Sequence, residues 1–251
     1  MNIERILNFR TIIILIFAAL LSYGIYWLII SNIFKNNLLL QLAENKSISY
    51  KTIDSSGFPT QIQTNINEFE IINSKSDDIL LESKAIHLSI HPFDLSKVAL
   101  KSNLISILVN KDNFIFDIDM NSVLSVISVD QNNLHNFNSA VNNIKISGND
   151  IFLANLDQVH IKINENSPQL FDINTKVNSA RLETINSQNV SIEMKGALKL
   201  DNKVLNGNLN ILIKDLKTNE DVFNLPFNIK DNQVIFLFMN IFDLNKILFF
   251  L

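Results

Sequence analysis

Residues 11–34 contain no charged side chain, and this run constrains the fold more than any other feature of the chain. At about 1.5 Å per residue, a helix of this length covers roughly 36 Å, which is enough to cross a hydrocarbon layer of ~30 Å. In lipid every backbone N–H and C=O must be paired, and a helix pairs them within itself. Arg5 and Arg10 precede the run, while Lys35 follows it, and this bias predicts a cytoplasmic N-terminus.

Two alternatives compete with an uncleaved membrane anchor. A cleaved signal peptide would have a shorter apolar core and a cleavage site of small residues, and residues 31–35 offer no such site. A helix buried inside a soluble domain usually keeps a polar stripe, which this run lacks. Tyr23, Tyr26 and Trp27 lie towards the far end of the run, where amphipathic rings favour a membrane interface. We therefore expect an uncleaved transmembrane anchor.

The sequence beyond the anchor changes from helical to strand periodicity. Leu38, Leu39 and Leu42 predict that residues 33–44 continue as a short helix. From residue 48 onward, apolar and polar residues alternate with the period of half-buried strands. The clearest such segments are residues 47–52, 60–72, 84–90, 113–120, 158–163, 190–200 and 205–213. The alternation shifts phase near Phe69, and Ala197 falls out of phase, which predicts a β-bulge near Gly196.

Such alternation is typical of antiparallel sheets with one buried face and one wetter face. We predict a mainly β fold, in which an N-terminal transmembrane helix is followed by an antiparallel, curved or groove-like β-sheet domain with few short helices. Residues 130–143 are a predicted helix, because Leu134, Phe137 and Val141 recur at helical spacing. The expected organisation is a cytoplasmic tail (1–10), the transmembrane anchor (11–34), a helical link (35–46) and a periplasmic β-rich domain (47–251).

The C-terminal residues 234–251 are very apolar, so a second transmembrane helix is an alternative there. Asp243 and Lys246 lie inside this stretch, and each costs roughly 2.5–3.5 kcal/mol near the centre of a bilayer. We therefore predict a buried strand at 234–238 followed by a closing apolar segment.

The composition excludes several kinds of chemistry. A net charge of −4 without a Lys/Arg stripe argues against nucleic-acid binding, and the absence of cysteine removes disulfides, thiolate zinc sites and cysteine nucleophiles. His87 and His91 share a strand face opposite Ile86 and Ile90, but no Cys or acidic motif accompanies them as metal ligands. Neither a G-x-S-x-G elbow nor a phosphate-binding glycine loop is present. We predict no catalytic, cofactor-binding or metal-binding residues, no cofactor, and no enzymatic activity.

The most individual motif is the turn that contains Gly57, Phe58 and Pro59, preceded by Ser55 and Ser56. Glycine permits a turn that other residues resist, and proline pushes the residue before it into an extended conformation. The motif therefore sets a large aromatic side chain at the start of the next strand. A plain inter-strand turn with Phe58 in the core is favoured over a binding role.

Several blocks of the sequence resemble a bacterial family catalogued as domain of unknown function 2125. They are the membrane helix, the Ser-Gly-Phe-Pro turn at 56–59, the segment 86–95 with its His-Pro-Phe-Asp-Leu ending, and the segments 196–201 and 205–209. The resemblance implies a single-pass inner-membrane protein that faces the periplasm of a Gram-negative cell. Its strand-rich layout is similar to AsmA-type proteins, whose β-sheets form apolar grooves associated with lipid transport and outer-membrane assembly.

Our leading hypothesis is a membrane-tethered β-groove that binds or guides lipid or another apolar ligand in envelope maintenance. The alternative is a structural or assembly protein that binds other envelope proteins through its sheet edges. A third, enzymatic reading needs titratable groups brought together by folding, around His87 and His91.

Overall fold

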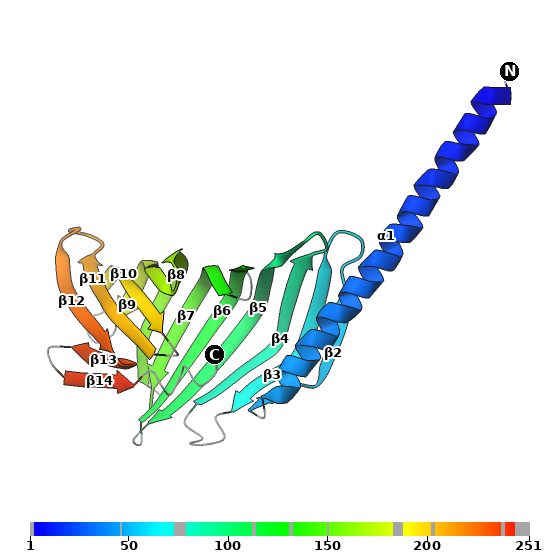
Figure 1. Ribbon diagram of the computed structural model, residues 1–251. Helices are drawn as coiled ribbons and strands as arrows, with labels where there is room; N and C mark the ends of the chain where they lie inside the picture. Colours follow the sequence, from blue (N-terminus) through cyan, green and yellow to red (C-terminus); the bar gives the residue numbers. More distant parts are fainter. Residues whose placement is uncertain are drawn as a thin grey trace.

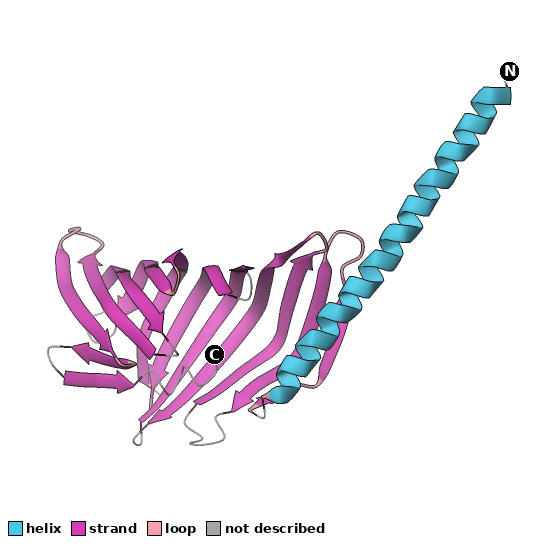
Figure 2. Cartoon of the chain, in the orientation of Figure 1, coloured by secondary structure: helices cyan, strands magenta, loops and turns pink. Residues whose placement is uncertain are grey.

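The computed structural model describes residues 3–45, 47–72, 79–111, 114–130, 133–149, 151–182, 188–201, 204–236 and 239–243. One long helix, α1 (Ile3–Glu44), comes first, and the other regular elements within these residues are β-strands (Figures 1 and 2). In chain order the strands are β1 (Ile48–Ser49), β2 (Thr52–Ser56), β3 (Ile62–Ile72), β4 (Ile79–His91), β5 (Asp94–Lys111), β6 (Phe114–Asp130), β7 (Asn133–Gly148), β8 (Ile151–Ser167), β9 (Leu170–Leu182), β10 (Gln188–Asp201), β11 (Val204–Asp215), β12 (Asp221–Lys230), β13 (Gln233–Phe236) and β14 (Met239–Asp243).

All strands belong to one antiparallel sheet of 14 strands, and from β3 onward each strand pairs with its neighbours in the chain. β1 and β2 both pair with β3, one after the other along its length. Within the described residues the two ends of this series do not pair with each other, so the sheet is an open, curved layer (Figure 1). The predicted mainly β fold, with an apolar N-terminal helix and a curved antiparallel sheet, is confirmed.

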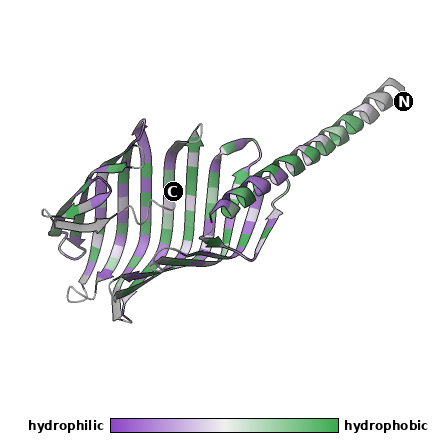
Figure 3. Cartoon of the chain, turned by 60° about the horizontal axis from the view of Figure 1, so that its bottom comes forward, coloured by the Kyte–Doolittle hydropathy of each residue, from purple (hydrophilic) through white to green (hydrophobic). Residues whose placement is uncertain are grey.

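The pairing register gathers the apolar side chains on one face of the sheet. Val123, Val141, Val159 and Val177 are paired in turn across β6 to β9, and all four are buried. The residues next to these valines point to the opposite face and are exposed, as at Asn142, His160, Lys176 and Asn178. Figure 3 shows hydrophobic and hydrophilic residues alternating along the strands in bands that cross the sheet. We call the surface that carries the buried valines the apolar face. From β3 to β12 it includes Ile66, Ile86, Leu100, Met120, Val141, Val159, Val177, Ile192, Ile213 and Leu225.

A line of irregular residues, which we call the crease, crosses the sheet. It contains Glu68 in β3, Ser122 in β6, Asn143 in β7 and Gln158 in β8, whose φ angles are 50°, 53°, 63° and 52°. Ser122 falls between the pairs Asn121–Asn142 and Val123–Val141, so the pairing of β6 with β7 is interrupted there. Asn143 and Gln158 fall in the gap between the pairs Val141–Val159 and Ile144–Leu156 of β7 and β8. In a strand of period two, one irregular residue exchanges the faces on which the following side chains lie. The exchange at the crease coincides with a phase shift in the sequence, so apolar residues before and after it, such as Ile66 and Phe69, lie on the same side of the sheet. The phase shift near Phe69 is this step at Glu68.

Serine hydroxyls satisfy the backbone where the crease interrupts pairing between β4 and β5. The Oγ atoms of Ser83 and Ser102 lie 2.9 Å apart, and both side chains are buried. Ser83 Oγ also donates to the Leu104 carbonyl over 2.9 Å, and Ser102 Oγ reaches the same oxygen over 3.0 Å. Because a buried carbonyl without a partner is costly, these hydroxyls stabilise the bend.

Two local predictions are wrong. Of the predicted helix at 130–143, Asp130 ends strand β6 and residues 133–143 belong to strand β7, while residues 131–132 lie outside the described residues. Phe137 and Val141 are four residues apart, a spacing that fits one face of a strand as well as of a helix, and the polar Ser139 on that face hides the alternation. Ser139 is buried and its Oγ lies 2.8 Å from that of Ser125 on β6.

The predicted bulge near Gly196 is also wrong. Pairing of β10 with β9 and β11 is continuous through Gly196, and Ala197 is simply an exposed residue on the polar face. The register shift in β10 lies instead between Val190 and Ile192. In the C-terminal stretch, β13 and β14 form a hairpin, so its described part is strand and not a second membrane helix; residues 237–238 and 244–251 lie outside the described residues.

Helix α1 lies over the first strands on the apolar face, and its N-terminal half projects away from the sheet (Figure 1). Residues 33–44 continue α1 without a break, as the leucine spacing predicted. Leu38, Leu39 and Leu42 pack against a buried cluster of Ile53, Ile66, Phe69 and Ile86. The second half of α1 is therefore part of the folded domain.

Candidate functional site

The middle of α1 is fastened to two turns of the sheet by hydrogen bonds from aromatic side chains. Tyr26 Oη donates to the carbonyl oxygen of Pro92 over 2.7 Å, and Trp27 Nε1 donates to that of Gln61 over 3.0 Å. Both acceptors are backbone atoms, so the contact depends on the shape of each turn. Trp27 is only 7% exposed, although it lies within the apolar run of the sequence.

The Gly57-Phe58-Pro59 motif forms the turn between β2 and β3, and this turn is one half of the attachment. Gly57 has a φ of 98°, and a Cβ there would lie 2.7 Å from the backbone oxygen of Gln61, so the turn requires glycine. The Phe58 ring meets the Trp27 indole edge-on at 5.4 Å, and Tyr23 Oη donates a hydrogen bond to the Pro59 carbonyl. Phe58 is 56% exposed, so it is not the core residue that the sequence favours.

The turn between β4 and β5 forms the other half of the attachment. Its Phe93 ring stacks on Tyr26 at 5.6 Å with an interplanar angle of 8°, and on Tyr23 at 5.7 Å. Offset stacking of this kind stabilises aromatic pairs beyond the area they bury. Phe93 nevertheless remains 69% exposed. We call Tyr23, Tyr26, Trp27, Phe58 and Phe93 the aromatic joint.

Asp94 ends the β4–β5 turn with its charge fully paired. Its carboxylate accepts a hydrogen bond from Ser96 Oγ over 2.6 Å and one from Lys97 Nζ over 3.0 Å. These two hydrogen bonds, Ser96 first, lower the pKa of Asp94 below its usual value. The turn therefore presents an ion pair and an aromatic ring, with no unpaired carboxylate.

The sheet curves towards the side that carries α1 (Figure 1), and we call the apolar face on this concave side, beyond the joint, the groove. Six valine and alanine side chains form its buried floor across β6 to β10, and half-buried residues such as Ile105, Met120 and Ile161 pack around them. The opposite face is polar and rich in asparagine; Asn136 Nδ2, for example, donates to Asn164 Oδ1 over 2.6 Å. One surface of the sheet is therefore polar and the other apolar.

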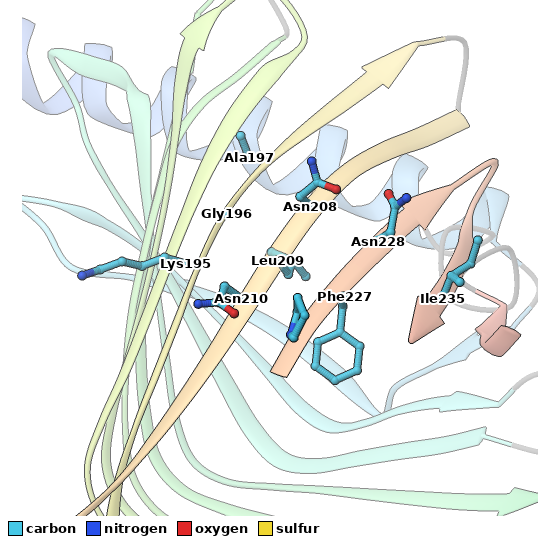
Figure 4. A pocket seen from close by; sticks show the side chains of 10 residues that line it. Lys195, Gly196, Ala197, Asn208, Leu209, Asn210, Phe227, Asn228 and Ile235 are labelled. Carbon is cyan, nitrogen blue, oxygen red and sulfur yellow. The ribbon is translucent and has the colours of Figure 1, made fainter. Parts of the chain in front are cut away.

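A cavity of about 560 Å³ lies against β10 to β13 (Figure 4). Gly196, Leu209 and Phe227 are register partners on three neighbouring strands in its lining. A Cβ at Gly196 would lie 2.0 Å from the carbonyl oxygen of Asn208 and 2.9 Å from Leu209 Cα, so these backbones approach too closely for any side chain. The volume falls within the range of small-molecule sites. Asn228 adds an amide to the lining.

The two histidines considered as metal ligands do not form a site. His87 Nδ1 lies 2.6 Å from Asn65 Oδ1 on the polar face, and His91 sits at the β4–β5 turn beside Phe93. In the part of the chain that the structure describes, no group of three His, Cys, Asp or Glu side chains is placed to hold a metal ion.

Sequence reasoning singled out the Gly57-Phe58-Pro59 turn but missed what it contacts. It assigned Tyr23, Tyr26 and Trp27 to a membrane interface and did not connect them to Phe58 or Phe93. The available signal was the recurrence of aromatic residues at two turns, each next to a proline. No family model, curated protein or solved structure matches this chain.

Proposed function

We propose that this chain is a single-pass membrane protein of the bacterial inner membrane, and that its periplasmic groove binds or guides the acyl chain of a lipid, or a similar apolar ligand, in envelope maintenance. The helix is long and apolar enough to span a membrane. The positive bias before residue 11 supports a cytoplasmic N-terminus. The resemblance to domain of unknown function family 2125 supports the same placement.

The observation that carries the proposal is that, within the described residues, no helix or second sheet packs on the apolar face beyond the beginning of β5. An apolar sheet face is stable in water only when another element covers it. Within the described residues, the helix contacts with this face involve β3, β4 and, through Val98 and Leu100, the beginning of β5. From β6 to β12 the sheet continues with the same apolar series, so an acyl chain is the kind of partner that this surface suits.

The groove is long enough for such a ligand. Beyond the strands that α1 covers, β6 to β12 are separated by six strand-to-strand steps of about 4.8 Å, which gives a path of roughly 29 Å along the curved sheet. An acyl chain covers one leaflet of a bilayer, or about 15 Å of hydrocarbon. The path therefore accommodates a whole chain and extends well beyond it, which favours movement along the sheet as well as binding.

A matched pair of variants on β6 tests the proposal. Ile118 lies on the apolar face and is half-buried, whereas Ile115 on the same strand lies on the opposite face and is 44% exposed. We expect the full chain, purified in mild detergent and extracted with organic solvent, to release lipid detected by mass spectrometry. Ile118→Asn should lose most of this lipid, and Ile115→Asn should retain it.

Circular dichroism of both variants verifies that the sheet is still folded. Recovery of equal lipid from the two folded variants, or of none from the unaltered chain, would refute lipid binding on this face.

A second candidate, assembly with other envelope proteins, is favoured by the open ends of the sheet. In the described residues β14 pairs only with β13, and β2 pairs only with β3. Edges of this kind can accept a strand from a partner. Site-specific crosslinking from β2 to a distinct envelope protein, together with lipid-free purified protein, would favour this candidate.

A further inference from the structure

We propose that the sheet itself enters the membrane: the β2–β3 and β4–β5 turns are embedded in the leaflet nearest the sheet, with Phe58 and Phe93 at the boundary between headgroups and acyl chains. This inference rests on the proposed insertion of α1 and goes beyond it, because it assigns a lipid contact to the sheet domain. The partner is the same bilayer that α1 crosses.

The length of free helix carries the argument. Counted from Thr11, a hydrocarbon layer of ~30 Å requires about 20 helical residues and ends near Ile30. The sheet, however, already contacts α1 at Tyr23, which is about 18 Å along the axis from Thr11, and at Trp27, which is about 24 Å along it. The contacting turns therefore lie about 6–12 Å inside the far boundary of a hydrocarbon layer that begins at Thr11.

Two adjustments leave this conclusion in place. A tilted helix rises less per residue along the membrane normal, which carries the turns deeper. If Arg10 extends its side chain back to the headgroups, α1 shifts outward by roughly 5 Å, and the contacting turns then lie about 1–7 Å inside the boundary, at the top of the acyl chains. A sheet held wholly in water would leave about 12 uncharged residues, from Thr11 to Ser22, or roughly 18 Å, to cross the bilayer.

The surface of the two turns has the chemistry of a membrane interface. Residues 55–61 carry no charge. Phe58, Phe93 and Leu95 are 56%, 69% and 51% exposed, so three large apolar side chains project at neighbouring positions. The ionised groups of the β4–β5 turn, Asp94 and Lys97, neutralise each other across 3.0 Å. Aromatic rings beside paired polar groups favour the headgroup boundary over water.

Embedding these turns connects the groove to the membrane. Two apolar-face residues next to the turns are buried with Trp27. They are Ile62, which follows the β2–β3 turn, and Ile90, which precedes the β4–β5 turn. The half-buried Val98 on β5 extends this cluster away from the helix. The apolar face therefore begins at the depth of the acyl chains, without an intervening polar layer.

Depth-dependent fluorescence quenching tests the embedding directly, because Trp27 is the only tryptophan of the chain. The full chain is reconstituted into vesicles of phosphatidylethanolamine and phosphatidylglycerol that contain lipids brominated at defined acyl positions. In a Trp27→Phe background, tryptophan is placed by Phe58→Trp, Phe93→Trp, Phe17→Trp within the helix, or Leu216→Trp. Leu216 is the matched control, since it is an exposed apolar residue in the distant β11–β12 turn.

We expect tryptophan at 58 and 93 to lose at least half of its fluorescence with bromine near the top of the acyl chains, tryptophan at 17 to be quenched most by deeper bromine, and tryptophan at 216 to be unaffected. Quenching at 17 alone would overturn the embedding while leaving the anchor intact. Absence of quenching at 17 would overturn both.

Single cysteines provide a second readout that keeps both phenylalanines. The chain has no cysteine of its own, and Thr60 is exposed in the β2–β3 turn. A spin label at Thr60→Cys should be more accessible to oxygen than to a polar nickel complex, whereas one at Thr218→Cys should show the reverse. Equal preference for the polar complex at both positions would contradict the embedding.

Discussion

The replacement of Trp27 by alanine tests whether the sheet and α1 form one folded unit. Trp27 is 7% exposed and packs against Ile62 and Ile90, so its removal leaves a void at the joint. The lost Nε1 hydrogen bond to Gln61 accounts for about 1 kcal/mol, and the edge-on contact with Phe58 accounts for about 1 kcal/mol more.

Lost packing against the two isoleucines adds about 1–2 kcal/mol. The hydrophobic contribution of burying the Trp27 indole is smaller than it would be in water, because Trp27 in the unfolded state would contact lipid or detergent. We therefore expect Trp27→Ala to lower the free energy of unfolding by about 3–4 kcal/mol, which is more than a hundredfold in the folding equilibrium. Trp27→Phe keeps an aromatic ring and should lose about 1 kcal/mol.

Chemical unfolding of the full chain in mixed micelles, followed by circular dichroism of the strands, measures these differences. Leu28 is the matched control, because it is next in sequence, is 57% exposed and should cost less than about 0.5 kcal/mol as alanine. The docked arrangement of α1 would be refuted if Trp27→Ala were no less stable than Leu28→Ala.

Three further predictions concern the turns and the crease. Gly57→Ala should cost about 1–3 kcal/mol in thermal unfolding, because its Cβ would meet the Gln61 backbone at a φ of 98°, whereas the exposed Ser56→Ala should be nearly neutral. Ser83→Ala should cost about 1–3 kcal/mol in the same assay, since it weakens the hydrogen bonds at the crease, and a cost near zero would show that the bend does not need the hydroxyl. Backbone hydrogen bonds from Thr218 and Lys217 lower the pKa of Asp215, so the stabilisation that Asp215 gives to the β11–β12 turn is complete above the ordinary carboxyl pKa of 3.8 and is lost as the pH falls through the lowered value. The Asn219 amide should therefore be equally protected from hydrogen exchange at pH 7 and pH 5, and Asp215→Ala should weaken its protection at both.

Prediction of secondary structure succeeded where apolar residues alternate without interruption. Ile86, Leu88 and Ile90 defined both the strand and its buried face, and the structure agrees. It failed at residues 133–143 because Ser139 occupies a buried position that sequence patterns assign to apolar residues. The hydroxyl of Ser139 is paired with Ser125 on the neighbouring strand, and such a partner is not visible in the sequence of one strand.

The candidate site was predictable only in part. The sequence identified the Gly57-Phe58-Pro59 turn, since glycine and proline restrict the backbone locally. It did not show that Phe58 contacts Trp27, because the two residues lie far apart in the sequence and meet only when α1 packs against the β2–β3 turn. Nor did it show that Phe93, 35 residues further along the chain, stacks against the same helix.

The sequence by itself determined the apolar helix and the one-sided strands, because both follow from periodicities of a few residues. Only the tertiary structure decided that the strands form a single open layer, since alternation reports that a face is apolar and not what covers it. It also decided which part of the apolar run packs against the sheet. From Tyr23 onward one side of the helix contacts the sheet, and hydropathy does not distinguish contact with protein from contact with acyl chains.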